Sequence, residues 1–190
     1  MGTIVLNKVR LAFPDLFKVG TVPPGSDGEP KFGGTFIFEK DSEAFLRAQA
    51  EVVKVATTKW GKNAIAVIGE LPKDKLCLRK GNSNLDKQGE VRSGFQDMMF
   101  VRASSKVRPI VVDRDKTPLI EADGRPYGGC YVNVSIDIYP MDKLGKGIYA
   151  TLLAVQFDSD GDSFGGAKGT ADVFDSLDDG ESAPKVSDLF

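Results

Sequence analysis

The feature that most constrains the fold is the strict alternation in "YVNVSIDIY", from Tyr131 to Tyr139. Every second residue is aliphatic, namely Val132, Val134, Ile136 and Ile138. Successive side chains of a β-strand point to opposite faces, so the pattern predicts a strand with one face in the core and the other toward solvent. A half-buried strand of this kind is typical of an antiparallel sheet.

Strand patterns also occur in residues 4–13, 31–40, 75–78, 97–103, 109–112 and 147–157. In the first of these, Val5, Val9 and Leu11 are expected to share the buried face. The glycine pair in "KFGGTFIFEK" indicates a bulge or a close backbone approach. The last segment, "GIYATLLAVQF", is apolar on both faces, which predicts a central strand.

One long helix is expected to interrupt the strands. Asp41 or Ser42 can cap it, apolar residues recur at helical spacing as far as Trp60, and Gly61 is expected to end it. "NAIAVIGEL", residues 63–71, can add a second short helix. Several strands with one inserted helix predict a mainly β protein, an antiparallel barrel whose helix closes one end or bridges two strands. Long loops are expected at residues 18–30, 79–94 and 113–129.

The charge of the chain is unevenly distributed. Residues 158–190 hold nine acidic and two basic residues, a net charge of −7, so residues 1–157 carry +5 within the total of −2. Residues 73–108 hold nine basic and four acidic residues and account for this whole excess. The distribution predicts a body that binds a polyanion, followed by a flexible acidic tail that contains too few apolar residues to fold.

Several kinds of catalytic chemistry are excluded by composition. The sequence has no histidine, which removes Ser-His-Asp and Cys-His catalysis and His-based zinc sites. Cys77 and Cys130 lie in strand-like segments and are expected to be buried thiols. The acidic residues of the body form no recognisable metal-binding set, so we predict no catalytic, metal or cofactor site. A metal-dependent nuclease stays a weaker alternative.

The basic residues are interleaved with aromatic ones. Proteins hold single-stranded nucleic acid with cations along the phosphates and with aromatic rings that stack on bases at about 1–3 kcal/mol each. The candidate cations are Lys8, Arg10, Arg79, Lys80, Lys87, Arg92, Arg102, Lys106 and Arg108. The candidate stacking rings are Phe95, Tyr127, Tyr131 and Tyr139. At each position the alternative is a solvated cation or a ring that only covers the core.

Five blocks of the sequence can be compared with a known family. "VRLAFPDLF", the "KWG" at the helix end, "KLCLRKGNSNLDKQGEV", "YGGCYVNVSIDIY" and "GKGIYATLLAVQFDSDGDSFGG" resemble a tailed-phage family of single-stranded-DNA-binding proteins. The family was formerly a domain of unknown function, has an Enterobacter phage member, and is matched over residues 4–166. The resemblance implies an oligonucleotide/oligosaccharide-binding (OB) fold, related in plan to the podovirus single-stranded-DNA-binding protein. It also implies sequence-independent binding of single strands in phage replication and recombination.

The chain ends on "DSLDDGESAPKVSDLF", which is similar to the acidic, phenylalanine-ended tails of bacterial and phage single-strand binders. A terminal Phe can fill an apolar pocket while its carboxylate pairs with a partner's cation, and the acidic tail can also compete with DNA for the basic body. The residues expected to bind partners are Asp175, Asp178, Asp179, Glu181, Asp188, Leu189 and Phe190. The alternative is a solubilising tail without a partner.

These inferences predict an OB-fold single-stranded-DNA-binding domain at residues 1–157 and a flexible acidic C-terminal tail at residues 158–190. Replication or recombination proteins are the expected tail partners, and weaker binding of duplex DNA is left open. No signal peptide or membrane-spanning run is found, so the cytoplasm of the infected bacterial host is the expected location. The main alternative is a protein-interaction or scaffold module whose acidic tail mimics DNA.

Overall fold

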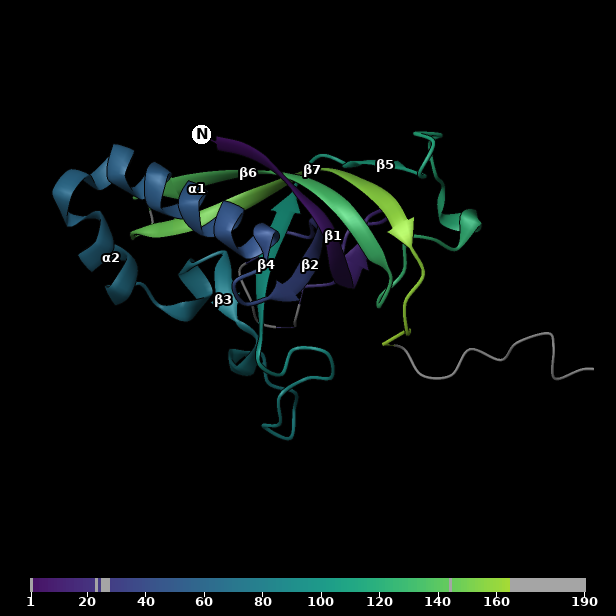
Figure 1. Ribbon diagram of the computed structural model, residues 1–190, viewed down its shortest axis with the longest axis horizontal. Coiled ribbons are helices and arrows are strands. Elements are labelled where there is room, and N and C mark those ends of the chain that lie inside the picture. Colours follow the sequence, from purple (N-terminus) through teal and green to yellow (C-terminus); the bar gives the residue numbers. More distant parts are fainter. Residues whose placement is uncertain (1, 23, 25–27, 144, 165–190) are drawn as a thin grey trace, which may run out of the picture.

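Seven β-strands and two α-helices form the described part of the chain (Figure 1). The computed structural model describes residues 2–22, 24, 28–143 and 145–164, so the tail residues named above lie outside the described residues. The strands are β1 (Gly2–Asp15), β2 (Phe32–Glu39), β3 (Leu78–Lys80), β4 (Met98–Ser105), β5 (Ile110–Val112), β6 (Tyr131–Met141) and β7 (Gly147–Ser159). The helices are α1 (Glu43–Trp60) and α2 (Ala64–Glu70), with short 3-10 turns at Gly61–Asn63, Lys73–Lys75, Gly81–Ser83 and Glu121–Asp123.

The strands join in the order β3-β4-β2-β1-β6-β7-β5. Neighbours from β3 to β7 pair antiparallel, and β5 pairs parallel with β7. A parallel contact between Ser104 of β4 and Thr151 of β7 closes β4, β2, β1, β6 and β7 into a barrel. The predicted mainly β antiparallel barrel is therefore confirmed.

Strand β6 is the centre of the barrel wall, between β1 and β7. The four aliphatic residues that alternate along β6 are 0% exposed, whereas the residues between them are partly exposed. Strand β7 is also central, since it pairs with β6, β5 and β4. Its expected burial on both faces is wrong, because Leu153 is 38% exposed and Tyr149 and Thr151 are partly exposed on the same strand.

A bulge in β1 shifts the predicted alternation. Leu6 pairs with Val134 and Val9 pairs with Val132, so β1 advances three residues where β6 advances two. Lys8 lies in this bulge and takes a positive φ of 51°. Leu6 and Val9 are therefore both buried, while Val5 points outward and is 41% exposed. The prediction that Val5 shares the buried face is wrong because a bulge reverses the faces of all residues on one side of it.

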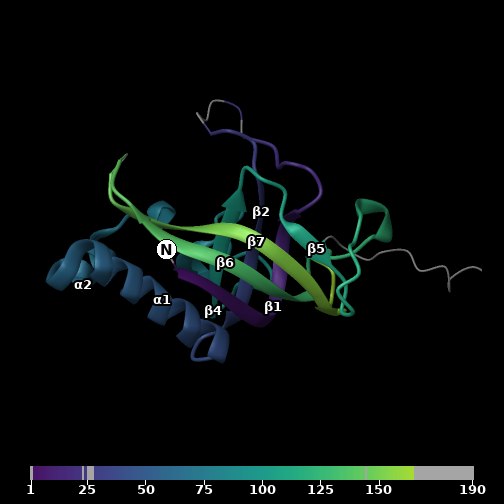
Figure 2. The ribbon, with the colours of Figure 1, turned by 90° about the horizontal axis from the view of Figure 1, so that it is seen from above.

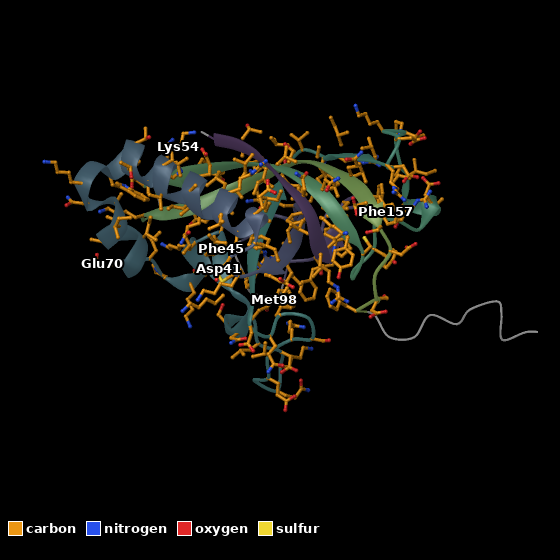
Figure 3. All side chains as sticks on the ribbon, in the orientation of Figure 1. Asp41, Phe45, Lys54, Glu70, Met98 and Phe157 are labelled. Carbon is orange, nitrogen blue, oxygen red and sulfur yellow. The ribbon has the colours of Figure 1, made fainter. Side chains whose placement is uncertain are left out.

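Helix α1 begins and ends where the sequence indicates. The Ser42 hydroxyl accepts a hydrogen bond from the Phe45 amide at 3.2 Å, and Gly61 ends the helix with φ 58°, a conformation that glycine adopts without strain. Phe45 is buried on the face that packs on the barrel (Figure 3). Trp60 donates its indole N–H to Asp142 at 3.0 Å, which fixes the helix end to the β6–β7 turn.

The helices and β5 lie at opposite ends of the barrel (Figure 2). Helix α1 packs on β1 and β6 and bridges β2 to β3 in the chain. No helix among the described residues has both the length and the apolarity that crossing a membrane would need.

Candidate nucleic-acid interface

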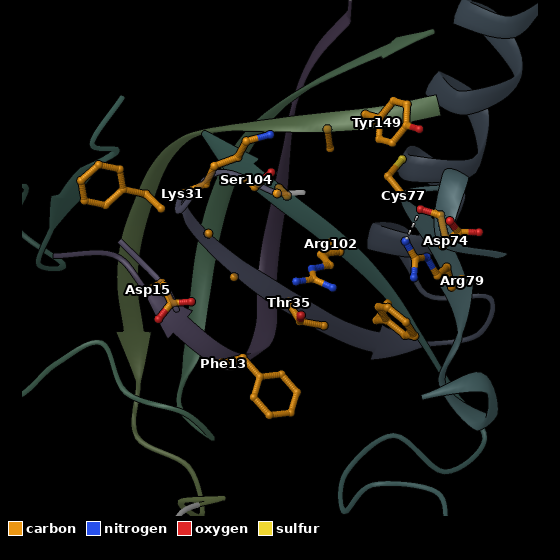
Figure 4. Close-up of a pocket in the computed structure, with 18 of the residues that line it drawn as sticks. Phe13, Asp15, Lys31, Thr35, Asp74, Cys77, Arg79, Arg102, Ser104 and Tyr149 are labelled. Carbon is orange, nitrogen blue, oxygen red and sulfur yellow. Dashed lines mark hydrogen bonds between the residues drawn. The ribbon is translucent and has the colours of Figure 1, made fainter. Parts of the chain in front are cut away.

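A groove of about 750 Å³ runs over β2 and β4 (Figure 4). The segment that leads into β2, strand β3 and the ends of β6 and β7 form its borders. Its cations are Lys31, Lys73, Arg79, Arg92 and Arg102, and its acids are Asp15, Glu29 and Asp74. Its aromatic rings are Phe13, Phe32, Phe100, Tyr139 and Tyr149. The groove therefore combines an excess of positive charge with aromatic walls.

Arg102 lies at the middle of this groove. It faces Thr35 across the β2–β4 pair, its side chain is exposed, and Figure 4 shows it extending into the opening. Within the described part of the chain, its guanidinium makes no hydrogen bond or ion pair with another side chain. Arg102 thus presents its charge to solvent, where an anionic ligand can reach it.

Arg79 and Asp15 lie on either side of Arg102. Arg79 donates to the carbonyl oxygens of Leu76 at 2.5 Å and Asp74 at 3.0 Å; burial and then the positive charge of Arg102 lower the pKa of Arg79. Burial raises the pKa of the Asp15 carboxyl, and the charge of Arg102 opposes this. The cations are close enough to repel each other, and an anion between them would relieve that repulsion.

Phe13 is the most exposed ring of the groove. A second bulge in β1, between Ala12 and Asp15, gives Phe13 a positive φ of 49° and leaves it 53% exposed. Its ring lies 6.2 Å from that of Phe95 and 5.3 Å from the Arg92 guanidinium carbon. An aromatic residue at positive φ is uncommon, and such backbone strain is found most often at functional sites.

Phe95 is not a stacking platform, which corrects the prediction made for it. Its ring is only 1% exposed, since Phe13 covers one side and Phe100 meets it edge-to-face at 5.4 Å. A base can reach Phe13 but not the ring beneath it. Sequence reasoning missed Phe13 because the bulge that turns it outward has no local sequence signal.

Tyr139 and Tyr149 pair across β6 and β7 at the other end of the groove. Their ring centroids are 6.1 Å apart with a 35° tilt, and burial raises the pKa of the Tyr139 hydroxyl. The sequence indicated Tyr139 but not Tyr149. Both rings lie partly exposed at the groove, where they can stack on a base.

Five of the predicted cations are exposed on the surface but do not line the groove: Lys8, Lys80, Lys87, Lys106 and Arg108. Lys106 pairs with Glu29 at the groove border. Arg108 lies over the ring of Phe17 at 5.5 Å. Of the nine predicted cations, Arg79, Arg92 and Arg102 line the groove.

The remaining three predicted residues, Arg10, Tyr127 and Tyr131, hold residues 160–164, which we call the strap. Arg10 donates to the carbonyl oxygens of Gly129 at 3.1 Å and Asp162 at 2.8 Å, and its guanidinium lies 4.2 Å above the Phe164 ring. The Tyr127 hydroxyl donates to the Asp160 carboxylate at 2.8 Å. Tyr131 packs beside Gly161 in the same strap. These three side chains are therefore already engaged within the protein.

Metal-ligating and thiol chemistry finds no support in the described residues. Within residues 2–22, 24, 28–143 and 145–164, no group of three or more Cys, Asp or Glu side chains gathers as a metal site would require. Cys77 and Cys130 are both buried thiols, as expected. Burial raises the pKa of the Cys77 thiol to about 12, so this group stays protonated and unreactive at neutral pH.

The chain belongs to the family of the Enterobacter phage Enc34 ssDNA-binding protein, whose family model matches residues 2–184. The putative protein p50 of Acyrthosiphon pisum secondary endosymbiont phage 1 is 38% identical over 179 residues, covering 92% of this chain and 93% of that protein. These matches confirm the family predicted from the sequence blocks.

Solved structures show the same fold. The single-stranded DNA-binding protein from bacteriophage Enc34, in complex with ssDNA, is similar with a TM-score of 0.67 and 27% identity, over 86% of this chain and 90% of that one. The single-stranded DNA-binding protein gp2.5 of bacteriophage T7 is similar with a TM-score of 0.55, over 93% of this chain and 99% of that one. At 10% identity, the second match shows the fold alone. The predicted OB-type fold is confirmed.

Proposed function

We propose that this protein binds single-stranded DNA without sequence recognition through the groove over β2 and β4, as a non-enzymatic protein of phage DNA replication and recombination. The observation that carries the proposal is the exposed pair of Phe13 and Arg102 in one groove. The solved Enc34 relative with its bound ssDNA supports the same ligand. The cytoplasm of the infected bacterium is the compartment in which this ligand would be met.

The groove provides both devices that single-strand binding needs. Its cations can neutralise successive phosphates, and Phe13 at one end and the Tyr139–Tyr149 pair at the other can stack on bases. Phosphates and aromatic base faces are common to all sequences, so such contacts do not discriminate between them. The binding free energy should therefore depend on salt more than on sequence.

We further propose that the acidic tail recruits replication or recombination proteins and competes with DNA for the groove. Residues 160–164 support this proposal because the strap lies on the barrel through Arg10 and Tyr127. The chain continues from Phe164, which shares a cavity with Phe13 and Arg92 at the end of the groove. A segment that starts there needs little length to reach the groove cations.

Fluorescence anisotropy with labelled single-stranded and duplex oligonucleotides tests the proposed function. The full chain and a chain ending at Phe164 should both bind the single strand, the shortened chain more tightly, and added salt should weaken both complexes. Ending at Phe164 instead of Phe157 keeps the strap and its contacts. If neither chain binds either oligonucleotide, the proposed DNA-binding function is wrong and a protein-interaction module becomes the better explanation.

The recruitment proposal has its own test. A chain lacking Leu189 and Phe190 should lose binding to the phage or host polymerase in a pull-down, while its affinity for single-stranded DNA stays within about twofold because two apolar residues contribute no charge to competition. Unchanged capture of the polymerase would contradict the proposed role of the two terminal residues.

A further inference from the structure

A second cavity, of about 240 Å³, adjoins the groove at Phe13. Phe13 and Arg92 line both cavities, so a strand lying in the groove passes the mouth of the smaller one. Phe95 and Phe164 form further walls, and Asp86 lies at the side. We call this cavity the base slot. It is built from β1, the loop between β3 and β4, and the strap, three parts of the chain that are distant in sequence.

The size and the walls of the base slot suit one aromatic ring system. An apolar cavity of about 150 Å³ is enough to take up benzene, and one liquid water occupies about 30 Å³. At about 240 Å³, the base slot is larger than that benzene-sized cavity. Phe13 and Phe164 offer π-surfaces, and the Arg92 guanidinium lies 5.3 Å from the Phe13 ring. These are the contacts that favour an unstacked nucleobase.

Asp86 gives the base slot a hydrogen-bond acceptor. One of its carboxylate oxygens, Oδ1, accepts from the amides of Gln88 at 2.8 Å and Glu90 at 3.0 Å, which fixes the orientation of the group. Its other oxygen, Oδ2, makes no hydrogen bond or ion pair within the described residues. A carboxylate repels phosphate, so Asp86 suits the edge of a base and not the backbone of the strand.

The bases differ in what they offer to such an acceptor. Cytosine carries an N4 amino group that donates to Asp or Glu, whereas thymine has the O4 acceptor at the same place. A thymine in the base slot would place its O4 acceptor next to the Asp86 carboxylate, which is also an acceptor, so no hydrogen bond could form between them. Adenine also carries an amino donor, but the two pyrimidines give the cleaner comparison because they have the same ring size.

We propose that the base slot takes one base of the bound strand and prefers a base with an amino group, cytosine over thymine. The inference rests on the proposed function and deepens it, because it adds a local base preference to binding that is otherwise independent of sequence. Phe13 and Phe164 hold the ring, and Asp86 reads its edge.

The test is an anisotropy titration of the full chain with oligo-dC and oligo-dT of equal length, at mildly alkaline pH where oligo-dC stays unfolded. Oligo-dC should bind about tenfold to a hundredfold more tightly, the value of one charge-assisted hydrogen bond. Asp86→Asn keeps an Oδ1 that can accept from the same two amides and replaces Oδ2 by an N–H donor. This variant should lose the preference or reverse it toward oligo-dT.

Two further variants separate the base slot from the groove. Phe164→Ala removes one wall and should bring the ratio of the two affinities toward one, which keeps the test valid if Asp86→Asn fails to fold. Arg102→Ala should weaken both complexes and leave the ratio unchanged, because a phosphate contact does not distinguish bases. Thermal unfolding of each variant shows that it folds.

Three results would each overturn the proposal for the base slot. They are equal affinities for the two oligonucleotides, a preference for oligo-dT, and a ratio of affinities that Asp86→Asn and Phe164→Ala leave unchanged. All of these results would leave the proposed function standing. Binding of neither oligonucleotide, by the full chain or by the chain ending at Phe164, would instead overturn the proposed function itself.

Discussion

Two clusters of cations and aromatic rings in this molecule look alike in sequence but differ in structure. In the strap cluster, Arg10 is occupied by two carbonyl oxygens and the Phe164 ring, and the Tyr127 hydroxyl by Asp160. In the groove cluster, Arg102 and Phe13 face solvent. The same residue types therefore hold the fold together in one place and remain available to a ligand in the other.

The difference has an energetic meaning. Hydrogen bonds from a charged donor contribute about 1.5–3 kcal/mol each to stability, so recruiting Arg10 for DNA would first cost the bonds that hold the strap. In the groove, DNA binding is favoured, because Arg79 and Arg102 repel each other in the free protein. A phosphate beside Arg102 gains the attraction of both cations without breaking a side-chain contact of Arg102, and Arg79 can keep its bonds to the carbonyl oxygens of Leu76 and Asp74.

The strongest effect is expected from Arg102→Glu. Reversing this charge removes a phosphate contact and adds repulsion, so the affinity for single-stranded DNA should fall about tenfold to a hundredfold. The slope of the logarithm of the affinity against the logarithm of the salt concentration should become shallower by about one. The matched control is Lys8→Glu, which changes charge equally on a side chain that is exposed outside the groove. Anisotropy titrations at several salt concentrations measure the affinity and its salt dependence for each of the two variants. Equal losses would mean that the interface extends well beyond the groove.

Phe13→Ala should have the next largest effect on DNA binding. Loss of one stacking ring costs about 1–3 kcal/mol, which corresponds to roughly fivefold or more in affinity. Phe13→Trp should retain binding, since tryptophan offers a larger stacking face. Tyr131→Ala serves as the control because Tyr131 packs beside the strap at Gly161. The assignment of Phe13 is contradicted if the two alanine variants bind alike.

Arg10→Ala should act on stability and not on the groove. It removes two hydrogen bonds to carbonyl oxygens and the contact with the Phe164 ring. Because Arg10 is partly exposed, the free energy of unfolding should fall by about 3 kcal/mol, the lower end of what two charged hydrogen bonds contribute. Affinity for oligo-dT should change less than about threefold. Urea denaturation and anisotropy of the same preparation give both values. An unchanged stability with a large loss of binding would place Arg10 in the interface after all.

Asp15→Asn should produce the smallest effect, a gain of about twofold in single-strand affinity at neutral pH, because it removes one negative charge from the groove. Burial raises the pKa of Asp15. As the pH falls through that raised pKa, the wild-type carboxyl becomes neutral and its affinity should approach that of the variant. Anisotropy at neutral and at mildly acidic pH measures the difference. If the difference in affinity between Asp15→Asn and the wild type stays constant with pH, the charge of Asp15 is not the cause of the gain in affinity.

The fold could be predicted where its determinants are local. The alternation of β6 is repeated along a strand without a bulge, and α1 is bounded by the Ser42 cap and Gly61. Bulges are different because they depend on the partner strand. The one at Lys8 exchanged the faces of Val5 and Leu6, and the one at Phe13 turned that ring outward.

The candidate site could be predicted only in outline. Concentrated charge indicated Arg79, Arg92 and Arg102, and these three line the groove, which they reach from β3, β4 and the loop between them. Lys31 and Tyr149 come from segments that pairing through β2 and β7 brings to the same place, and no local pattern contains that pairing. Phe95 and Phe13 differ in burial and not in chemistry, so only the structure distinguishes them.

Hydrogen–deuterium exchange of the full chain, with and without a saturating single-stranded oligonucleotide, would locate the bound strand without any substitution. If the groove is the interface, protection should increase in β2, β4 and the peptide that contains Phe13, while peptides of the strap residues 160–164 should gain less. Protection confined to the strap or to the outer face of β5 and β7, with β2 and β4 unchanged, would show that the strand binds elsewhere.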